Sequence, residues 1–187
     1  MGMPGILERW TAARVRELPD DGNRYEVVDG ELLLTPAPSL AHQRAVGELF
    51  ALLRSYCQTT GVGEAVTSPA DIEFDLRTLV QPDVFVVPLE HGRRPEHWTD
   101  IHGLVLAIEV LSPSTARADR TVKRRRYQRA GLPEYWIVDL DARLVERWRP
   151  GDERPEVLTE RLVWQPEAAA APLGIDLPKL FARVLDA

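Results

Sequence analysis

One carboxylate lies inside the most apolar stretch of this chain. Residues 104–111 read LVLAIEVL, so Glu109 stands between Ile108 and Val110 in a run that is typical of a fully buried β-strand. An ionised carboxylate that is buried without a partner is strongly destabilising. Glu109 therefore requires a cation, a proton or a metal ion close by, and any fold that this chain adopts has to supply one.

A second carboxylate, Asp83, raises the same question. It follows Pro82 and opens the apolar run DVFVV of residues 83–87, which predicts another buried strand. Neighbouring strands lie about 4.8 Å apart, so Asp83 and Glu109 can share one divalent ion if the strand register places them side by side. Oxygen ligands favour Mg²⁺ or Mn²⁺ over zinc. The single cysteine, Cys57, excludes a disulfide framework and a cysteine-based zinc site.

Hydrophobic patterning along the rest of the chain predicts a mixed α/β fold. An Asp29–Gly30 turn inside residues 25–34 indicates a β-hairpin near the N-terminus. Apolar residues at helical spacing predict a helix over residues 40–57. A second helix is predicted over residues 119–130, with Asp119 as its N-cap.

The predicted strands belong to a mixed sheet flanked by these helices. A chain of 187 residues, 44% of them hydrophobic, has the size of one domain and can bury a substantial core. We expect a single domain over residues 1–187, with its core at about residues 20–150 and with C-terminal strands and a short helix over residues 151–187. The individual strands are predicted at residues 71–75, 83–87, 104–111, 134–139, 144–149 and 155–164, and the terminal helix at residues 176–185.

Positive charge is concentrated in the second predicted helix, although the chain as a whole carries a net charge of −6. The acidic balance argues against broad, non-specific coating of nucleic acid. A local basic helix still suits phosphate groups, and Lys123 in this helix could bring its ammonium back over the Glu109 strand. Consecutive helical residues lie about 100° apart, so not all the arginines can face one groove. The candidate phosphate contacts are Arg120, Arg124, Arg125 and Arg126.

Two further residues are weaker candidates for the same site. Glu26 begins an apolar hairpin strand and would add a third acidic group. His42 lies at the start of the first predicted helix, where it would contact the site or a phosphate. The alternative for both residues is that they lie on the surface, or behind the residues that contact the metal, and do not contact the metal themselves.

The sequence shows no sign of membrane association. No apolar run approaches the roughly 20 residues that are needed to cross a bilayer. Glu8 and Arg9 stand where a signal peptide would be apolar. We therefore expect a soluble, cytoplasmic protein that does not bind membranes.

Taken in chain order, several of these segments resemble the Uma-type restriction endonucleases of the PD-(D/E)XK nuclease superfamily. The resemblance covers about residues 20–150. The matching segments are YEVVDGEL, the His42 helix, QPDVFVV, IEVLSPST, Asp119-x-x-x-Lys123-x-x-x-Tyr127 and GLPEYWIVD.

The resemblance implies a restriction-endonuclease-like core, in which an N-terminal β-hairpin accompanies a mixed sheet flanked by helices. It also implies hydrolysis of phosphodiester bonds in nucleic acid, most simply DNA, with Mg²⁺ or Mn²⁺ as cofactor. Under this resemblance Asp83, Glu109 and Lys123 are the catalytic residues, and Asp83, Glu109 and the backbone carbonyl of Val110 are the metal ligands. Cutting both strands of a duplex would favour a homodimer.

One departure from the superfamily pattern concerns the lysine. The pattern has lysine two residues after the glutamate, where this chain has Leu111. In Uma-type sequences the lysine lies in the following helix, which makes Lys123 its counterpart here. Whether Lys123 reaches the site depends on geometry that residue spacing does not give.

Two other classes of function remain open at this point. The chain could be a catalytically silent module that keeps the nuclease fold and binds nucleic acid or a protein partner. It could also be an interaction module whose basic helix pairs with an acidic surface of another subunit.

Overall fold

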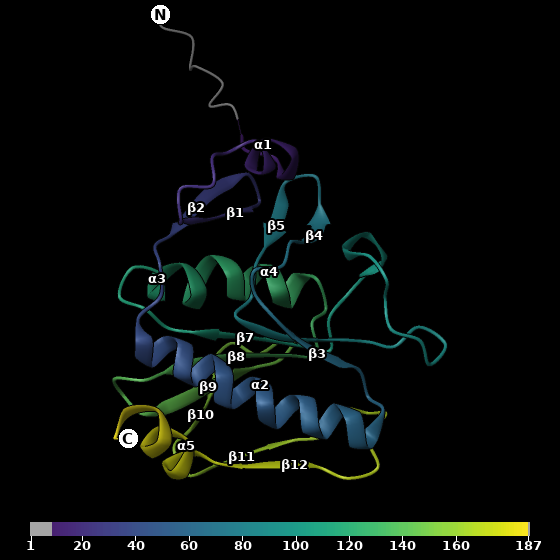
Figure 1. Cartoon of the computed structure of the whole chain (residues 1–187), viewed down its shortest axis with the longest axis vertical. Coiled ribbons are helices and arrows are strands. Elements are labelled where there is room, and N and C mark those ends of the chain that lie inside the picture. The colour runs from purple at the N-terminus through teal and green to yellow at the C-terminus, as the bar shows by residue number, and fades with distance from the viewer. Residues whose placement is uncertain (1–8, 187) are drawn as a thin grey trace, which may run out of the picture.

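Two β-sheets enclose a central helical segment in this computed structural model, which describes residues 9–186 (Figure 1). Glu8, on which part of the signal-peptide argument rests, lies outside the described residues. Within them, no helix combines the length and the apolar character that a membrane span requires.

The smaller sheet is antiparallel and has four strands in the order β2-β1-β5-β4. A short helix, α1, precedes it and packs on its outer face. The bounds of these elements are Ala12–Arg16 for α1, Arg24–Val28 for β1, Glu31–Thr35 for β2, Ile72–Asp75 for β4 and Thr78–Val80 for β5.

The larger sheet has six strands in the order β10-β9-β8-β7-β6-β3, and only its β7–β8 pair is parallel. A parallel pair needs a crossover connection, and the basic helical segment supplies it. The strands are β3 (Glu64–Thr67), β6 (Val84–Val87), β7 (Leu106–Val110), β8 (Glu134–Asp139), β9 (Leu144–Trp148) and β10 (Glu156–Leu158). The crossover consists of α3 (Ala116–Ala118), the π-helical turn η2 (Asp119–Lys123) and α4 (Arg124–Arg129).

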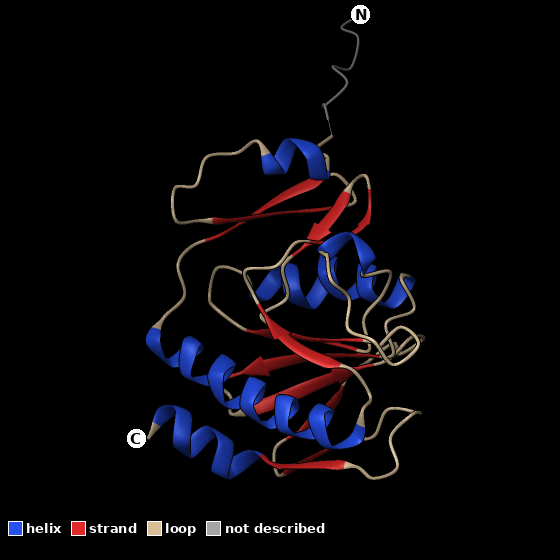
Figure 2. Ribbon diagram, turned by 45° about the vertical axis from the view of Figure 1, so that its right-hand side comes forward, coloured by secondary structure: helices blue, strands red, loops and turns tan. Residues whose placement is uncertain are grey.

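Further elements cover the other face of the larger sheet or extend its loops (Figure 2). A long helix, α2, and a C-terminal helix, α5, lie on that face beside a two-stranded sheet. Their bounds are Leu40–Thr60 for α2, Leu177–Leu185 for α5, Arg161–Trp164 for β11, Leu173–Asp176 for β12 and Trp98–Asp100 for the 3₁₀ turn η1.

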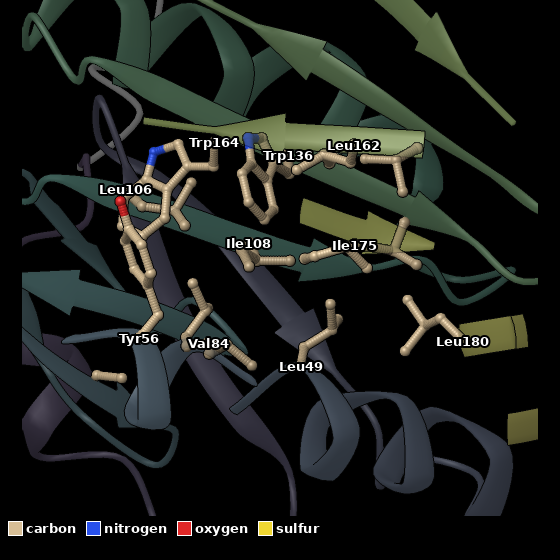
Figure 3. Packing of buried hydrophobic residues seen from close by; sticks show 14 of the residues in the cluster. Leu49, Tyr56, Val84, Leu106, Ile108, Trp136, Leu162, Trp164, Ile175 and Leu180 are labelled. Carbon is tan, nitrogen blue, oxygen red and sulfur yellow. The ribbon is translucent and has the colours of Figure 1, made fainter. Parts of the chain in front are cut away.

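Alternation along β7 explains how the two faces of the larger sheet differ. Leu106, Ile108 and Val110 belong to the apolar cluster on the α2 side, which Figure 3 shows with Leu49 of α2 nearby. Ala107 belongs to the cluster on the opposite side, toward α4. Because side chains alternate between the faces of a strand, Glu109 also faces α4 and the smaller sheet.

Most of the predicted elements are confirmed. The hairpin forms about Asp29 and Gly30, whose φ angles of 53° and 87° are those of a type I′ turn. The first helix runs three residues further than expected and ends at the left-handed Gly61. The mixed α/β class and the predicted mixed sheet with flanking helices also agree with the structure.

Two expectations are corrected, and several short elements were not predicted. The second helical segment begins at Ala116, so Asp119 is no N-cap but a buried residue of η2. Residues 155–164 form two strands in different sheets, because the chain bends at residues 159–160 and turns Leu162 and Trp164 into the core below the larger sheet. The elements that were not predicted are the short strands β3, β5 and β12, helix α1 and the turn η1.

The close approach of Gly63 to β6 gives a test of this packing. A Cβ atom at Gly63 would overlap the carbonyl oxygen of Val87 and would lie 2.7 Å from the Val86 side chain, so Gly63→Ala must displace backbone. We expect it to lower the free energy of unfolding by about 1–3 kcal/mol. Gly47 lies within α2, where a Cβ meets nothing within 4 Å. Gly47→Ala should therefore raise the free energy of unfolding by about 0.5–1 kcal/mol. Urea unfolding of both variants measures these free energies. Equal effects of the two substitutions would contradict the close approach of Gly63 to β6.

Candidate active site

The register of β6 and β7 brings the two predicted acidic residues together. These strands are antiparallel, with Val84 opposite Ile108. One residue further along, this register places Asp83 opposite Glu109, both on the face toward α4. Side chains at directly opposite positions of an antiparallel pair lie about 4.5–5.5 Å apart at Cβ. Asp83 and Glu109 are each only 3% exposed.

Asp83 is held by donors on both of its oxygens. The Val110 backbone N–H and His42 Nε2 donate to Oδ2, at 2.9 and 3.1 Å, and Arg24 Nη1 donates to Oδ1 at 2.9 Å. Burial by itself would raise the pKa of Asp83, but the hydrogen bond and charge of His42, followed by Arg24 and the Val110 N–H, bring this pKa below its ordinary value. Asp83 is accordingly ionised in the folded protein.

Lys123 lies buried among three other carboxylates. Its Nζ is 2.7 Å from Glu26 Oε2, 3.0 Å from Glu109 Oε1 and 3.3 Å from Asp119 Oδ1. Burial would lower the pKa of Lys123, but Glu109, Glu26 and Asp119 outweigh burial and raise it well above its ordinary value. Lys123 is thus a charged ammonium in contact with the smaller sheet, the larger sheet and its own helical segment.

Buried carboxyl groups outnumber the permanent cations at this site. Four carboxyl groups are buried here, those of Glu26, Asp83, Glu109 and Asp119. In the contacts described above, their permanently charged partners are two, Lys123 and Arg24. Burial raises the pKa of Glu109 well above its ordinary value, because Lys123 does not offset burial together with repulsion from Asp119 and Asp83. Glu109 therefore still requires a proton or a further cation.

The backbone around Val110 adds a further oxygen donor. The paired residues of β6 and β7 end at Val84 and Ile108, and extending this register by two residues would bring Pro82 opposite Val110. The Val110 N–H points toward β6, since it donates to Asp83, and the carbonyl of an extended residue points to the same side. Because proline has no N–H, Pro82 cannot donate a ladder hydrogen bond to this carbonyl.

The donor set fits Mg²⁺ or Mn²⁺. It consists of two carboxylates and one carbonyl, which are hard oxygen donors. Among residues 9–186, however, no group of three or more His, Cys, Asp or Glu side chains is placed so that it could hold a metal ion.

A cavity of about 500 Å³ gives access to these residues. Its walls include the connection from β2 to α2 and the loop after β7, at residues 36–39 and 112–115. The residues of the site that line it are Arg24, His42, Asp83, Glu109, Val110 and Lys123. A ligand of nucleotide size can therefore approach the acidic pair from one side.

The four arginines that were predicted to contact phosphates do not form one continuous basic surface. Arg120 lines the cavity but is paired with Asp139 and Glu146, at 2.8 and 2.7 Å. Arg124 stacks on the Trp148 ring, with 4.6 Å between Cζ and the ring centroid. Arg126 pairs with Asp75 at 2.8 Å, and Arg125 is exposed. Three of these four arginines already have partners within the protein.

Sequence reasoning missed two residues of the site. Arg24 stands two positions before Glu26 in the same strand, and this spacing places both side chains on one face. Asp119 stands four residues before Lys123, a spacing that brings helical side chains into contact. The assumption that Asp119 caps the helix concealed this second signal. Leu111, at the position of the superfamily's lysine, packs against the apolar cluster toward α4.

The Lys123 network predicts a pH-dependent loss of stability. Lys123→Met leaves buried carboxylates without their cation, and we expect it to lower the free energy of unfolding by about 3–5 kcal/mol at neutral pH. Carboxyl groups whose pKa is raised on folding favour the folded state below their unfolded pKa, and this contribution is lost as pH rises. The deficit relative to wild type should therefore be smaller near about pH 5 than near about pH 8.

Urea unfolding at the two pH values measures this deficit. Lys179→Met is the matched control, because Lys179 is exposed and its ion pair is with the partly exposed Asp176. This substitution should change stability little at either pH. A deficit of the same size for both lysines, or one that does not depend on pH, would contradict the network.

Comparison with known proteins adds independent information. A family model described as "Uma2: Putative restriction endonuclease" matches residues 12–178. The fold is similar to the crystal structure of "a putative nuclease belonging to DUF820" from Anabaena variabilis, with a TM-score of 0.75 and 23% sequence identity, over 94% of this chain and 99% of that chain. No curated protein matches the chain. The solved structure shows the likeness in fold, and the family match, which spans most of the chain, shows that the chain belongs to the Uma2 family.

Proposed function

We propose that this protein is a divalent-metal-dependent endonuclease that hydrolyses phosphodiester bonds in nucleic acid, with DNA as the substrate. The observation that carries the proposal is the β6–β7 register, which sets Asp83 opposite Glu109 on the wall of a cavity beside Lys123. Two adjacent carboxylates, a backbone carbonyl and a lysine form a suitable site for metal-assisted phosphodiester hydrolysis.

Each residue of the site has a distinct task in this proposal. Asp83, Glu109 and the Val110 carbonyl would hold Mg²⁺ or Mn²⁺, which supplies Lewis-acid polarisation of the phosphate and a nucleophilic water at neutral pH. His42 and the Val110 N–H fix the Asp83 carboxylate in one orientation. Lys123 orients Glu109 and presents positive charge to a phosphate from the cavity wall.

Glu26 and Asp119 act on Lys123 and not on the substrate. They contact its ammonium from the smaller sheet and from η2, so they hold the lysine in place and keep it charged. Glu26 is itself fixed by the backbone N–H of Gln81, which donates to Oε1 at 2.7 Å. Both are positioning residues.

A catalytically silent nuclease-fold module is the second candidate, and one observation favours it. Each acid of the central pair already contacts a cationic side chain of the protein, Asp83 with Arg24 and Glu109 with Lys123. In a protein that binds no metal, these ion pairs would offset the cost of burying the two carboxylates. The two candidates differ in whether the acidic pair binds a divalent ion.

Metal binding is the first test of the proposal. We expect wild-type protein to bind Mn²⁺ with a stoichiometry near one in isothermal titration calorimetry, and Asp83→Asn to lose this binding, because one carboxylate ligand is removed. Asp141→Asn is the matched control: Asp141 lines the same cavity and is exposed, so its loss changes the local charge equally but removes no proposed ligand. Absence of Mn²⁺ binding by folded wild type, both with and without a phosphodiester, or equal binding by Asp83→Asn, would favour the silent module.

Cleavage of nucleic acid is the second test. We expect Mn²⁺-dependent cleavage of circular DNA, and we expect Glu109→Gln to reduce the rate by at least about 100-fold, because it loses a metal ligand. Asp141→Asn should retain the rate. Circular single-stranded DNA, closed duplex and RNA tested in parallel identify the substrate. Cleavage that persists in Glu109→Gln at the wild-type rate would contradict the assigned site.

The salt dependence of DNA binding tests the arginines. If Arg125 contacts a phosphate, Arg125→Gln should weaken binding about equally for different sequences and reduce the slope of log K against log salt by about 1. Arg124→Gln should change the slope less, because Arg124 stacks on Trp148. A slope that is the same in wild type and Arg125→Gln would remove Arg125 from the interface.

A further inference from the structure

The contact between Arg24 and Asp83 spans the two sheets at the cavity. Arg24 is the first residue of β1 in the smaller sheet, and its Nη1 lies 2.9 Å from Oδ1 of Asp83, at the start of β6 in the larger sheet. The Arg24 side chain is 23% exposed, whereas that of Asp83 is 4% exposed. Because Arg24 is partly exposed and lines the cavity, a ligand in the cavity can reach its side chain.

The two carboxylate oxygens of Asp83 accept different numbers of hydrogen bonds. Oδ2 accepts two hydrogen bonds, from His42 and from the Val110 N–H, both of which are buried. Oδ1 accepts only the bond from Arg24 among the hydrogen bonds recorded for residues 9–186. Each carboxylate oxygen has two lone pairs, so Oδ1 is the atom through which Asp83 can coordinate an ion.

A divalent ion at Oδ1 would lie next to the Arg24 guanidinium. Two cations on one carboxylate oxygen repel each other, and this repulsion is weakly screened where water is largely excluded. Arg24 thus opposes metal binding for as long as it stays on Asp83. An anionic phosphate in the cavity would attract the guanidinium and relieve the repulsion, and arginine suits phosphate because its planar fork matches two oxygens.

We propose that Arg24 couples the two ligands of the site: it holds Asp83 when the metal is absent and transfers to a substrate phosphate when the metal binds. This inference rests on the proposed metal site at Asp83 and Glu109. Coupling of this kind is reciprocal, so a phosphodiester tightens metal binding by the same factor as the metal tightens phosphodiester binding. The free protein binds metal weakly and acquires full affinity with its substrate.

Calorimetric titration of Mn²⁺ in the absence of any nucleic acid isolates the first half of the coupling. Arg24→Met should bind Mn²⁺ about tenfold more tightly than wild type, because the competing cation is gone while His42 and the Val110 N–H still hold Asp83. Arg120→Met is the matched control, since Arg120 lines the same cavity but pairs with Asp139 and Glu146. It should leave the affinity within about threefold of wild type.

The second half of the coupling is the effect of a phosphodiester on Mn²⁺ affinity. It is measured first on the wild-type protein, so that the result does not depend on the folding of a variant. A thymidine dinucleotide with its natural phosphodiester should tighten Mn²⁺ binding about tenfold, and the same dinucleotide with a neutral methylphosphonate linkage should not. Chromatography after each titration verifies that the dinucleotide is intact. In Arg24→Met, or in Arg24→Gln if the first variant does not fold, the effect of the phosphodiester should be smaller than in wild type.

The outcomes separate this inference from the proposed function. Mn²⁺ binding that is equal or weaker in folded Arg24→Met, or a phosphodiester effect that is the same with and without Arg24, overturns the coupling and leaves the metal site standing. No Mn²⁺ binding by wild type or by any variant, with and without the dinucleotide, overturns the metal site and the coupling with it.

Discussion

The contacts of the buried Lys123 ammonium connect three layers of this protein. Glu26 approaches it from the smaller sheet, Glu109 from the larger sheet and Asp119 from the helical segment between them. A buried ammonium is stable only with such partners, and the ammonium in turn lowers the cost of burying these three carboxylates. The position of the helical segment, the approach of the two sheets and the geometry of the acidic site therefore depend on one another.

The local shape of the helical segment serves this arrangement. The residues from Asp119 to Lys123 form a π-helical turn, which is wider than an α-helical turn and is often found at functional sites. Both ends of this turn, Asp119 and Lys123, are buried. Tyr127, one turn further on, is fully buried against Tyr135 of the larger sheet.

The basic character of the segment also has a structural explanation. Arg120 pairs with Asp139 and Glu146 of the larger sheet, and Arg126 pairs with Asp75 of the smaller one. These arginines bind the segment to the two sheets on either side of it. A charge run that suggests a nucleic-acid surface in the sequence is here largely an element of internal packing, and this leaves Arg24 and the exposed Arg125 as the better candidates for phosphate contacts.

The comparison of sequence and structure shows which features are local. Glu109 and Asp83 could be identified because each interrupts or opens a short apolar run, and the hairpin because its turn residues favour positive φ. The register that sets Asp83 opposite Glu109 arises from pairing between segments that are far apart in the chain, as does the reach of Arg24 across the two sheets. Patterns within single segments do not contain this information.

The most direct test of the account is the position of a bound ion. An anomalous difference map from crystals of the wild-type protein soaked with Mn²⁺ should show one peak between Asp83 and Glu109, beside the Val110 carbonyl. A peak at another place, or no peak in crystals where Arg24 remains on Asp83 at high Mn²⁺ concentration, would contradict the claim that these two carboxylates form a metal centre.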